Sequence, residues 1–396
     1  MTMIQTAKRI EKVEEYYFSR KLAEVRSLDR PDFRIINLGI GSPDLAPDPK
    51  AISTLNASAS NPANHGYQNY KGIPALREAI AAFYLNTYGV VLDPEKNLLP
   101  LMGSKEGIMH VSMAFVNEGE KVLIPNPGYP TYASVSNLVG AVQESYRIDS
   151  FADEAIDFSR LSERDFSGVK IMWLNFPHMP TGRKAGKNIL EKLVKLAHDK
   201  NFLLVNDNPY SLILNKEPMS ILSVDGAEEV AMELNSLSKS HNMAGWRIGW
   251  LAGKKEHIDF VLRVKSNMDS GMFLGLQHAA VEALKSGKDW FARQDEIYQQ
   301  RRALALQMME TLNCRVYSDQ SGLFLWGQVP DDVSEVESWL NDLLHSQHVF
   351  ITPGFIFGSE GARFIRISLC SPAEKMQEAL GRIRQWISTK TKSTVS

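Results

Sequence analysis

The sequence has few cysteines, no long apolar run and almost no net charge. Its two cysteines, Cys314 and Cys370, cannot form a disulfide framework and belong to no CxxC pair, so we expect reduced thiols. No stretch reaches the roughly 18 consecutive apolar residues of a membrane span, and the polar N-terminus has no signal-peptide core. The 44 basic and 46 acidic residues give a net charge of −2, which offers no basic footprint for nucleic acid or an acidic membrane. These absences predict a cytoplasmic protein with neither nucleic acid nor membrane as a partner.

Metal-ligand spacing and internal repetition are also missing. The nine histidines show no HExxH or similar spacing, so we predict no structural or catalytic metal. No repeat and no low-complexity segment interrupts the chain. With 396 residues, 44% hydrophobic and 23% charged, the composition is that of an ordinary globular protein long enough for two domains.

Short apolar runs alternate with helical patterns from about residue 70 to 285. The runs are continuous rather than alternating, which is typical of strands buried on both faces of a parallel sheet. The clearest runs cover 121–125, 169–175 and 202–207, with an amphipathic helix at 187–200. The pattern therefore predicts an α/β fold with a mostly parallel sheet flanked by helices.

The pattern changes after residue 285. A long charged helix at 289–312 precedes short strands around 322–326 and 363–367, and a helix at 373–388 follows. This arrangement predicts a smaller α+β domain. The expected parts are an N-terminal segment that joins the small domain (1–47), a large α/β domain (48–285) and the small domain (286–396).

A lysine in the middle of the chain has neighbours that suit a phosphorylated aldehyde. Lys239 follows an apolar run at 230–234; Ser236 and Ser238 precede it, and Arg247 lies eight residues after it. Hydroxyl groups and a planar cation suit a phosphate, whereas an amine can form a Schiff base with an aldehyde. A nearby cation also disfavours the protonated amine. The alternative is an exposed lysine at a strand end.

A Gly-Ser turn is a second candidate for binding phosphate. Gly103, Ser104 and Lys105 follow a strand-like run and open an apolar helix at 108–116. Free backbone N–H groups and the positive end of the helix dipole favour an anion at such a turn. A simple helix cap without a ligand explains the same residues.

Polar and aromatic side chains at strand ends suggest a flat heterocyclic ligand, because ligands of open α/β sheets bind beyond the carboxyl ends of the strands. Asp207 ends an apolar run, where a protonated pyridine nitrogen of pyridoxal phosphate would be a suitable partner. An Asx-turn with Asn208 is the alternative. Tyr210 could reach the ring's phenolic oxygen and Tyr129 could stack on the ring, but a core tyrosine and a turn plug explain them equally well.

One arginine lies inside an apolar strand. Arg366 stands between Ile365 and Ile367. It is either ion-paired in the core or placed to hold a substrate carboxylate with two hydrogen bonds.

Together these segments resemble the class I/II aminotransferases, the fold-type I pyridoxal-phosphate enzymes. The resemblance runs from about Arg9 to the C-terminal helix, and its motifs occur in the family's order. The phrases at 37–44, 103–107 and 265–271 are most similar to the LL-diaminopimelate and alanine aminotransferase branch. The resemblance implies a pyridoxal 5'-phosphate-dependent transaminase that moves an amino group between an L-amino acid and a 2-oxo acid by a ping-pong mechanism.

The resemblance also assigns roles to individual residues. Lys239 would form the Schiff base, Asp207 would pair with the pyridine nitrogen, and Tyr210 and Tyr129 would contact the ring. The phosphate would be held by polar and cationic side chains: Ser104, Lys105, Ser236, Ser238 and Arg247. The substrate carboxylate would lie at Arg366, beside the backbone of Gly41 and the region of Asn175, which also borders the cofactor.

A homodimer with shared active sites follows from the same resemblance. Tyr67 matches the tyrosine that reaches the cofactor phosphate of the neighbouring subunit. Ser270 and Asn267 are expected to cross the interface as well, Ser270 toward the cofactor and Asn267 toward the substrate. Tyr16 lies where this branch has a substrate-side tyrosine.

One position departs from the family pattern. The Asn-Pro-Thr-Gly phrase reads Met179-Pro180-Thr181-Gly182 in this chain. The missing asparagine normally donates a hydrogen bond to the ring oxygen, and a thioether cannot donate. We expect Tyr210, alone or with Asn175, to supply this contact.

Two other functions fit parts of the pattern. A carbon–sulfur β-lyase on the same fold keeps the lysine, aspartate and arginine, so these residues do not separate it from a transaminase. A pyridoxal-phosphate-binding transcriptional regulator would need a DNA-binding module, for which the acidic balance gives no support. The substrate is not named by the sequence; Phe18, Ile40, Leu45 and His65 are candidates for its distal end, and each is equally explicable as packing.

Overall fold

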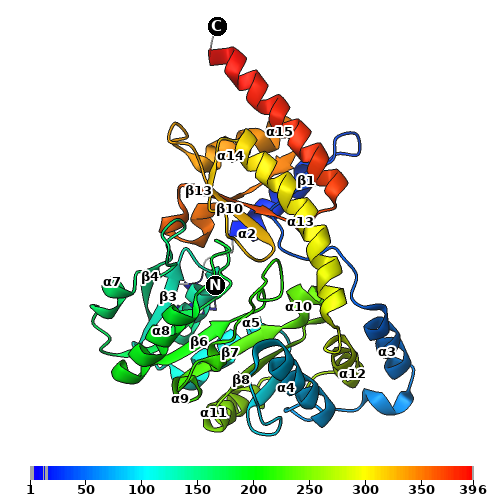
Figure 1. The fold of residues 1–396 in the computed structure, drawn as a ribbon, viewed down its shortest axis with the longest axis vertical. Coiled ribbons are helices and arrows are strands. Elements are labelled where there is room, and N and C mark those ends of the chain that lie inside the picture. The colour runs from blue at the N-terminus through cyan, green and yellow to red at the C-terminus, as the bar shows by residue number, and fades with distance from the viewer. Residues whose placement is uncertain (1–3, 12, 14–16, 395–396) are drawn as a thin grey trace.

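A seven-stranded sheet forms the centre of the large domain (Figure 1). The computed structural model describes residues 4–11, 13 and 17–394. The strand order is β2-β8-β7-β6-β5-β3-β4; β8 is antiparallel to both neighbours and the other adjacent pairs are parallel. The predicted mostly parallel sheet is confirmed. Its strands are β2 (Leu98–Leu101), β3 (Lys121–Asn126), β4 (Val142–Arg147), β5 (Val169–Leu174), β6 (Leu203–Asp207), β7 (Ala231–Ser236) and β8 (Gly249–Gly253).

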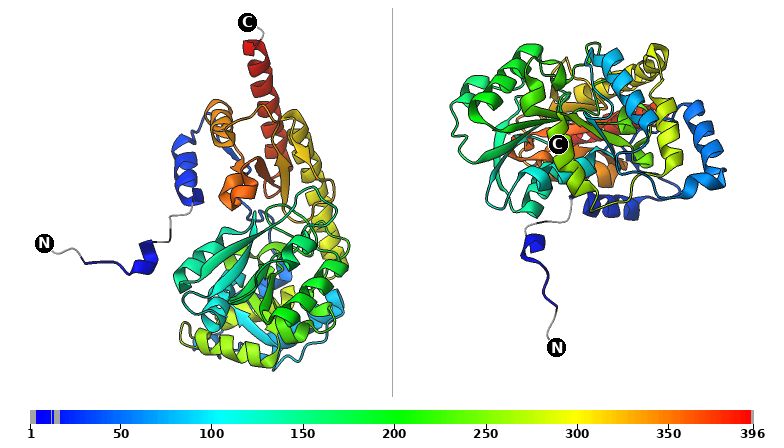
Figure 2. Two further views of the ribbon diagram at one scale, coloured as in Figure 1. Left: turned by 90° about the vertical axis from the view of Figure 1, so that its left-hand side faces the viewer. Right: turned by 90° about the horizontal axis from the view of Figure 1, so that it is seen from below.

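Helices cover both faces of this sheet (Figures 1 and 2). Along β5, Ile171 and Trp173 belong to one hydrophobic core, whereas Met172 and Leu174 belong to another. Successive side chains of a strand point to opposite faces, so the continuous apolar runs reflect two cores rather than one. The covering helices include α4 (Pro74–Tyr88), α5 (Ser104–Phe115), α6 (Pro130–Val139), α8 (Lys187–Lys200), α11 (Lys255–Lys265) and α12 (Leu274–Ala283).

Local sequence signals explain where these helices begin and end. Helix α4 starts with Pro74, whose missing N–H costs nothing in the first turn, and it ends at Gly89 in the left-handed conformation with φ 70°. The buried residues of α8 recur at helical spacing, and the helix spans the predicted range. The shorter helices of this domain are α3 (Pro49–Ala59), α7 (Phe158–Ser162), α9 (Ala227–Val230) and α10 (Leu237–Ser240).

The small domain combines a four-stranded antiparallel sheet with three helices. The strand order is β12-β13-β10-β9, and the long helix α13 runs from the large domain to the small one (Figure 1). The strands are β9 (Arg315–Val316), β10 (Phe324–Gln328), β12 (Thr352–Pro353) and β13 (Phe364–Ser368), and the helices are α13 (Lys288–Thr311), α14 (Val336–Gln347) and α15 (Ala373–Thr394). The smaller α+β domain is as predicted.

Residues 17–37 of the N-terminal segment pack on the small domain, whereas the preceding helix α1 (Lys8–Glu11) contacts α6 of the large domain. Strand β1 (Ile36–Asn37) pairs in parallel with β11 (Val349–Phe350), and helix α2 (Tyr17–Leu28) is held by a 2.9 Å hydrogen bond from Tyr17 to Glu337 of α14. The domain boundaries at residues 47 and 285 stay a prediction. In the described ranges, no helix combines the length and apolar character needed to cross a membrane.

The loop after β1 lies between the two domains. The Gly39 carbonyl accepts a 2.7 Å hydrogen bond from Arg366 of β13, and the Gly41 carbonyl accepts one of 2.6 Å from Lys239 of the large domain. The carboxyl ends of the parallel strands therefore face the small domain across this loop.

Candidate active site

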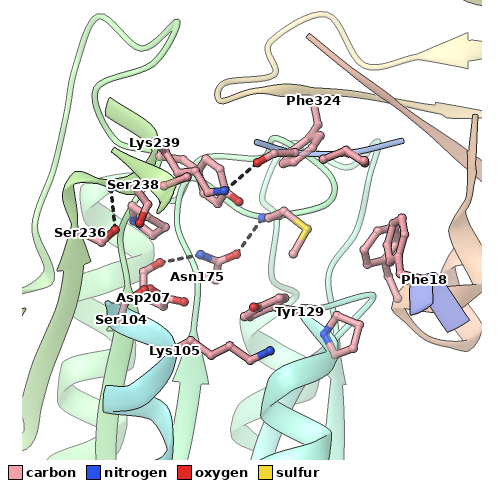
Figure 3. A pocket seen from close by; sticks show the side chains of 18 of the residues that line it. Phe18, Ser104, Lys105, Tyr129, Asn175, Asp207, Ser236, Ser238, Lys239 and Phe324 are labelled. Atoms are coloured by element: carbon pink, nitrogen blue, oxygen red, sulfur yellow. Dashed lines mark hydrogen bonds between the residues drawn. The ribbon is translucent and has the colours of Figure 1, made fainter. Parts of the chain in front are cut away.

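A cavity of about 560 Å³ lies between the two domains, at the carboxyl ends of the parallel strands (Figure 3). It brings together residues that are up to several hundred positions apart in the chain. The predicted residues that line it are Gly41, Ser104, Lys105, Tyr129, Asn175, Asp207, Tyr210, Ser236, Ser238, Lys239, Arg247 and Arg366.

Three predicted residues lie outside this cavity. Tyr67 is 94% exposed, and Asn267 and Ser270 are also exposed. The segment that carries Tyr67 lies beside the one that carries Asn267 and Ser270: a Cβ placed on Gly271 would lie 2.6 Å from the Gln68 carbonyl oxygen. The fourth, Tyr16, lies outside the described residues. Of the candidates for the distal end of the substrate, Phe18 and Ile40 line the cavity; His65 stacks on Phe273, and Leu45 packs on the core of the small domain.

Lys239 lies in the short helix that follows β7. The Ser236 hydroxyl caps this helix by accepting a 2.9 Å hydrogen bond from the Ser238 amide, and the turn aims the lysine into the cavity (Figure 3). Burial lowers the pKa of Lys239, and the nearby guanidinium groups of Arg366 and Arg247 lower it further. A buried amine with a lowered pKa is a good nucleophile and proton acceptor.

Asp207 ends β6 with one satisfied and one unsatisfied oxygen. The Tyr132 hydroxyl donates a 3.1 Å hydrogen bond to Oδ2, while buried Oδ1 has no hydrogen-bond partner among the described residues. Burial raises the pKa of Asp207 to about 7, against the lowering effect of the Tyr132 and Ser104 hydroxyls. A buried carboxylate oxygen without a partner fits a cationic N–H donor, as a protonated pyridine provides.

Asn175 and Met179 hold the loop after β5. The Asn175 amide nitrogen donates to the Asp207 carbonyl at 2.5 Å, and its oxygen accepts a 2.9 Å hydrogen bond from the Met179 amide. The Met179 sulfur accepts a 3.3 Å hydrogen bond from Arg366. The departure from the family phrase therefore places a soft acceptor beside the arginine. A ring-oxygen contact from Tyr210 or Asn175 stays a prediction.

Arg366 is a buried cation without an acidic partner. It donates to Gly39 and Met179, its Nε is unpaired, and no carboxylate in the described part of the chain forms an ion pair with it. Its guanidinium carbon lies 3.9 Å from the ring centre of Phe324 and 4.7 Å from that of Phe357. Burial lowers its pKa to about 10, so it remains charged at neutral pH. Arg366 is therefore not ion-paired within the described residues, and a buried cation held in this way suits an external carboxylate.

Hydroxyl groups, cationic side chains and a helix N-terminus line the part of the cavity around Ser104, Lys105 and Arg247. Helix α5 begins at Ser104, and Gly103 has a φ of 88°. A Cβ on Gly103 would lie 2.2 Å from a guanidinium nitrogen of Arg247, so only glycine permits this approach. Burial and Arg247 both lower the pKa of Lys105. This concentration of positive charge and N–H donors suits a phosphate.

Two features of the site were missed by sequence reasoning. Tyr132 holds Asp207 and stacks on Trp173 with ring centres 5.2 Å apart. The rings of Phe324 and Phe357 surround Arg366. Tyr132 is far from Asp207 in sequence, and Phe324 and Phe357 lie in apolar stretches, so the local sequence gives no sign of the polar group that each contacts.

Geometry of this kind defines a fold-type I pyridoxal-phosphate enzyme, and comparisons with known proteins agree. The family model described as aminotransferase class I and II matches residues 34–383. An LL-diaminopimelate aminotransferase of Dehalococcoides mccartyi is 37% identical over 96% of this chain and 98% of its own length. An LL-diaminopimelate aminotransferase of Moorella thermoacetica is 36% identical, and the match covers 96% of this chain and 98% of that protein.

Solved structures show the same similarity. Substrate-bound BacF of Bacillus subtilis superposes with a TM-score of 0.90, at 32% identity over 97% of this chain and 98% of BacF. A probable N-succinyldiaminopimelate aminotransferase of Thermus thermophilus superposes with a TM-score of 0.84. It is 32% identical, and the match covers 92% of this chain and 99% of that one.

This chain belongs to the class I/II aminotransferase family. It is a pyridoxal 5'-phosphate-dependent enzyme that transfers an amino group between an amino acid and a 2-oxo acid, as the sequence predicts. The relatives are named as aminotransferases, so the β-lyase alternative is not favoured. The unpaired Oδ1 of Asp207 and the cluster of cations fit the two ends of this cofactor.

The raised pKa of Asp207 predicts a pH-dependent stability of the cofactor-free protein. The folded state holds the proton up to about pH 7, whereas the usual value is 3.8, so stability falls as pH rises between these values. The contribution is at most on the order of 4 kcal/mol. Denaturant unfolding from pH 5 to pH 8 should show this slope, and Asp207→Asn should reduce it. Parallel curves for the two proteins would contradict the burial account.

Proposed function

We propose that transamination takes place in the cavity around Lys239, with Lys239 as the residue that links to the cofactor. The observation that carries this proposal is the convergence of a buried amine, an unpaired carboxylate oxygen and an unpaired guanidinium on one cavity. When bound, pyridoxal phosphate supplies an aldehyde for the amine and a ring that takes up negative charge from the substrate α-carbon.

Lys239 is also the proposed carrier of the transferred proton. Its lowered pKa favours the neutral amine, and in this proposal Nζ takes the α-proton of the amino acid and holds it between two transfers. Asp207 is the proposed anchor of the ring nitrogen through Oδ1, and Tyr132 keeps the carboxylate in place. Ser104, Lys105, Ser236, Ser238 and Arg247 are the proposed phosphate ligands, with Tyr129 and Tyr210 at the ring.

Arg366 is the proposed receptor of the substrate α-carboxylate. Two hydrogen bonds from one guanidinium fix the orientation of a carboxylate as well as its position. The surrounding rings of Phe324 and Phe357 exclude water and so strengthen this charge pair. Gly41 and Asn175 border the same end of the cavity.

A homodimer with shared active sites is part of the proposal. Tyr67 is 94% exposed in the single chain, and the neighbouring segment carries Asn267 and Ser270. An exposed tyrosine on an ordered segment is suited to contact a second subunit. We also propose a cytoplasmic location, consistent with Cys314 and Cys370 as free thiols, and a role in amino acid biosynthesis. LL-diaminopimelate, named for the relatives, is one donor to test.

Replacing the lysine should separate cofactor binding from turnover. Lys239→Ala should lower kcat by roughly 10²- to 10⁴-fold or more, because both the link and the proton carrier are lost. The variant should still retain cofactor through the phosphate ligands, as measured by absorbance after dialysis. Turnover at the wild-type rate would refute the assignment.

Removing the guanidinium should weaken substrate binding selectively. Arg366→Gln should lower kcat/KM by about 10- to 100-fold for both the amino acid and the oxo acid, through the loss of charge-assisted hydrogen bonds. Cofactor absorbance serves as the control and should stay unchanged. An unaltered KM for both substrates would be incompatible with this role.

Hybrid dimers test the shared site. In a dimer of one Tyr67→Ala chain and one Lys239→Ala chain, only an exchange of Tyr67 between subunits restores a complete site. Purified differentially tagged hybrids should therefore recover the wild-type cofactor affinity in one of their sites. If Tyr67 acts in the site of its own chain, or has no such role, both sites of the hybrid will bind the cofactor as they do in the two defective homodimers.

A further inference from the structure

The wall of the cavity nearest the small domain has no assigned role and is apolar. After the proposed cofactor and carboxylate ligands are set aside, six apolar residues line this wall: Phe18, Leu22, Ile40, Met179, Phe324 and Phe357. Four of them, Phe18, Met179, Phe324 and Phe357, adjoin Arg366, the proposed carboxylate receptor, so the wall lies beside the side chain of the substrate that it would hold.

The rings of this apolar wall lie close to the arginine. The Arg366 guanidinium carbon is 3.9 Å from the ring centre of Phe324, 4.7 Å from Phe357 and 5.7 Å from Phe18. Phe18 lies across the cavity from Lys239 (Figure 3). A substrate bound between Arg366 and Lys239 therefore extends its side chain along aromatic surface.

Helix α2 supplies part of the wall and is held in place. Phe18 and Leu22 are four residues apart and share one helix face. Lys21, which is buried, donates a 2.6 Å hydrogen bond to Asn341 of α14. Ile40, from the loop after β1, is 42% exposed although it is apolar. An ordered apolar surface that remains accessible is typical of a ligand contact.

Charged groups are distributed unevenly in the cavity. Among the described residues that line it, Asp207 is the sole carboxylate, and it lies at the proposed ring end. Within the described residues of one chain, the apolar wall offers no acid for a distal ammonium and no cation for a distal carboxylate. LL-diaminopimelate carries both charges on its far end, and burying them without partners is unfavourable.

We propose that the preferred amino donor is an L-amino acid with a large apolar side chain, aromatic or branched aliphatic, held against the wall by Phe18, Leu22 and Ile40. This inference rests on the proposed function, because it uses Arg366 as the carboxylate receptor. Aromatic side chains gain ring–ring contacts in addition to burial. The same wall disfavours the substrate named for the diaminopimelate relatives.

Binding of carboxylates tests the inference without turnover. Calorimetry on the holoenzyme should show 3-phenylpropanoate binding at least about tenfold more tightly than 6-aminohexanoate, because the second carries an ammonium into the apolar wall. Single half-reactions, followed by cofactor absorbance, should likewise favour L-phenylalanine and L-leucine over LL-diaminopimelate and L-lysine. A preference for the charged members of either set would overturn the inference.

A charge placed on the wall should remove the preference. Phe18→Glu should bring the two carboxylates to similar affinity, since it offers a partner to the ammonium. Leu28→Glu is the matched control: it adds the same charge to the same helix outside the cavity, and it should leave the ratio unchanged. An unchanged ratio in Phe18→Glu, or an equal change in both variants, would count against the wall as the specificity element.

The outcomes separate the two proposals. If the charged donor reacts faster, transamination stands and the apolar preference fails. If no amino acid reacts but the aromatic carboxylate still binds more tightly, the proposed function fails and the apolar preference of the wall stands.

Discussion

The arrangement of this site depends on a carboxylate buried with one oxygen unpaired. Asp207 lies at the end of β6, where Tyr132 satisfies one oxygen and the other forms no hydrogen bond within the described residues. Leaving a buried acceptor unpaired is unfavourable, and the raised pKa of Asp207 expresses that cost. A cofactor with a cationic ring nitrogen relieves it. The unpaired oxygen therefore suits the proposed contact with the ring nitrogen of pyridoxal phosphate.

The topology explains why the other ligands converge on this carboxylate. Parallel strands bring their carboxyl ends to one edge, so Asn175, Asp207 and Ser236 are neighbours although their strands are separated by helices. The small domain closes this edge with Arg366, and the loop at Gly39 and Gly41 connects both sides through hydrogen bonds. The proposed cofactor ligands thus lie mainly on the large domain, and Arg366, the proposed substrate ligand, lies on the small one.

Much of this could be predicted from the sequence because it leaves local signals. Apolar runs that end in polar residues indicated the strands and the polar side chains at their ends. The Gly-Ser turn indicated the start of α5. Tyr132 could not be found in this way, since its partner Asp207 is 75 positions away in the sequence. The aromatic rings around Arg366 were hidden for the same reason. The role of Tyr67 was predicted only from the family resemblance, because its side chain is exposed in the single chain and, among the described residues, contacts nothing that would indicate a function.

The central claim is that the amine of Lys239 links to the cofactor aldehyde. Borohydride reduction of the holoenzyme, followed by digestion and mass spectrometry, tests it most directly. The account predicts that the mass of the reduced cofactor is attached to the peptide containing Lys239 and to no other lysine. Attachment at another lysine, or a colourless protein that acquires no added mass after incubation with pyridoxal phosphate, would contradict it.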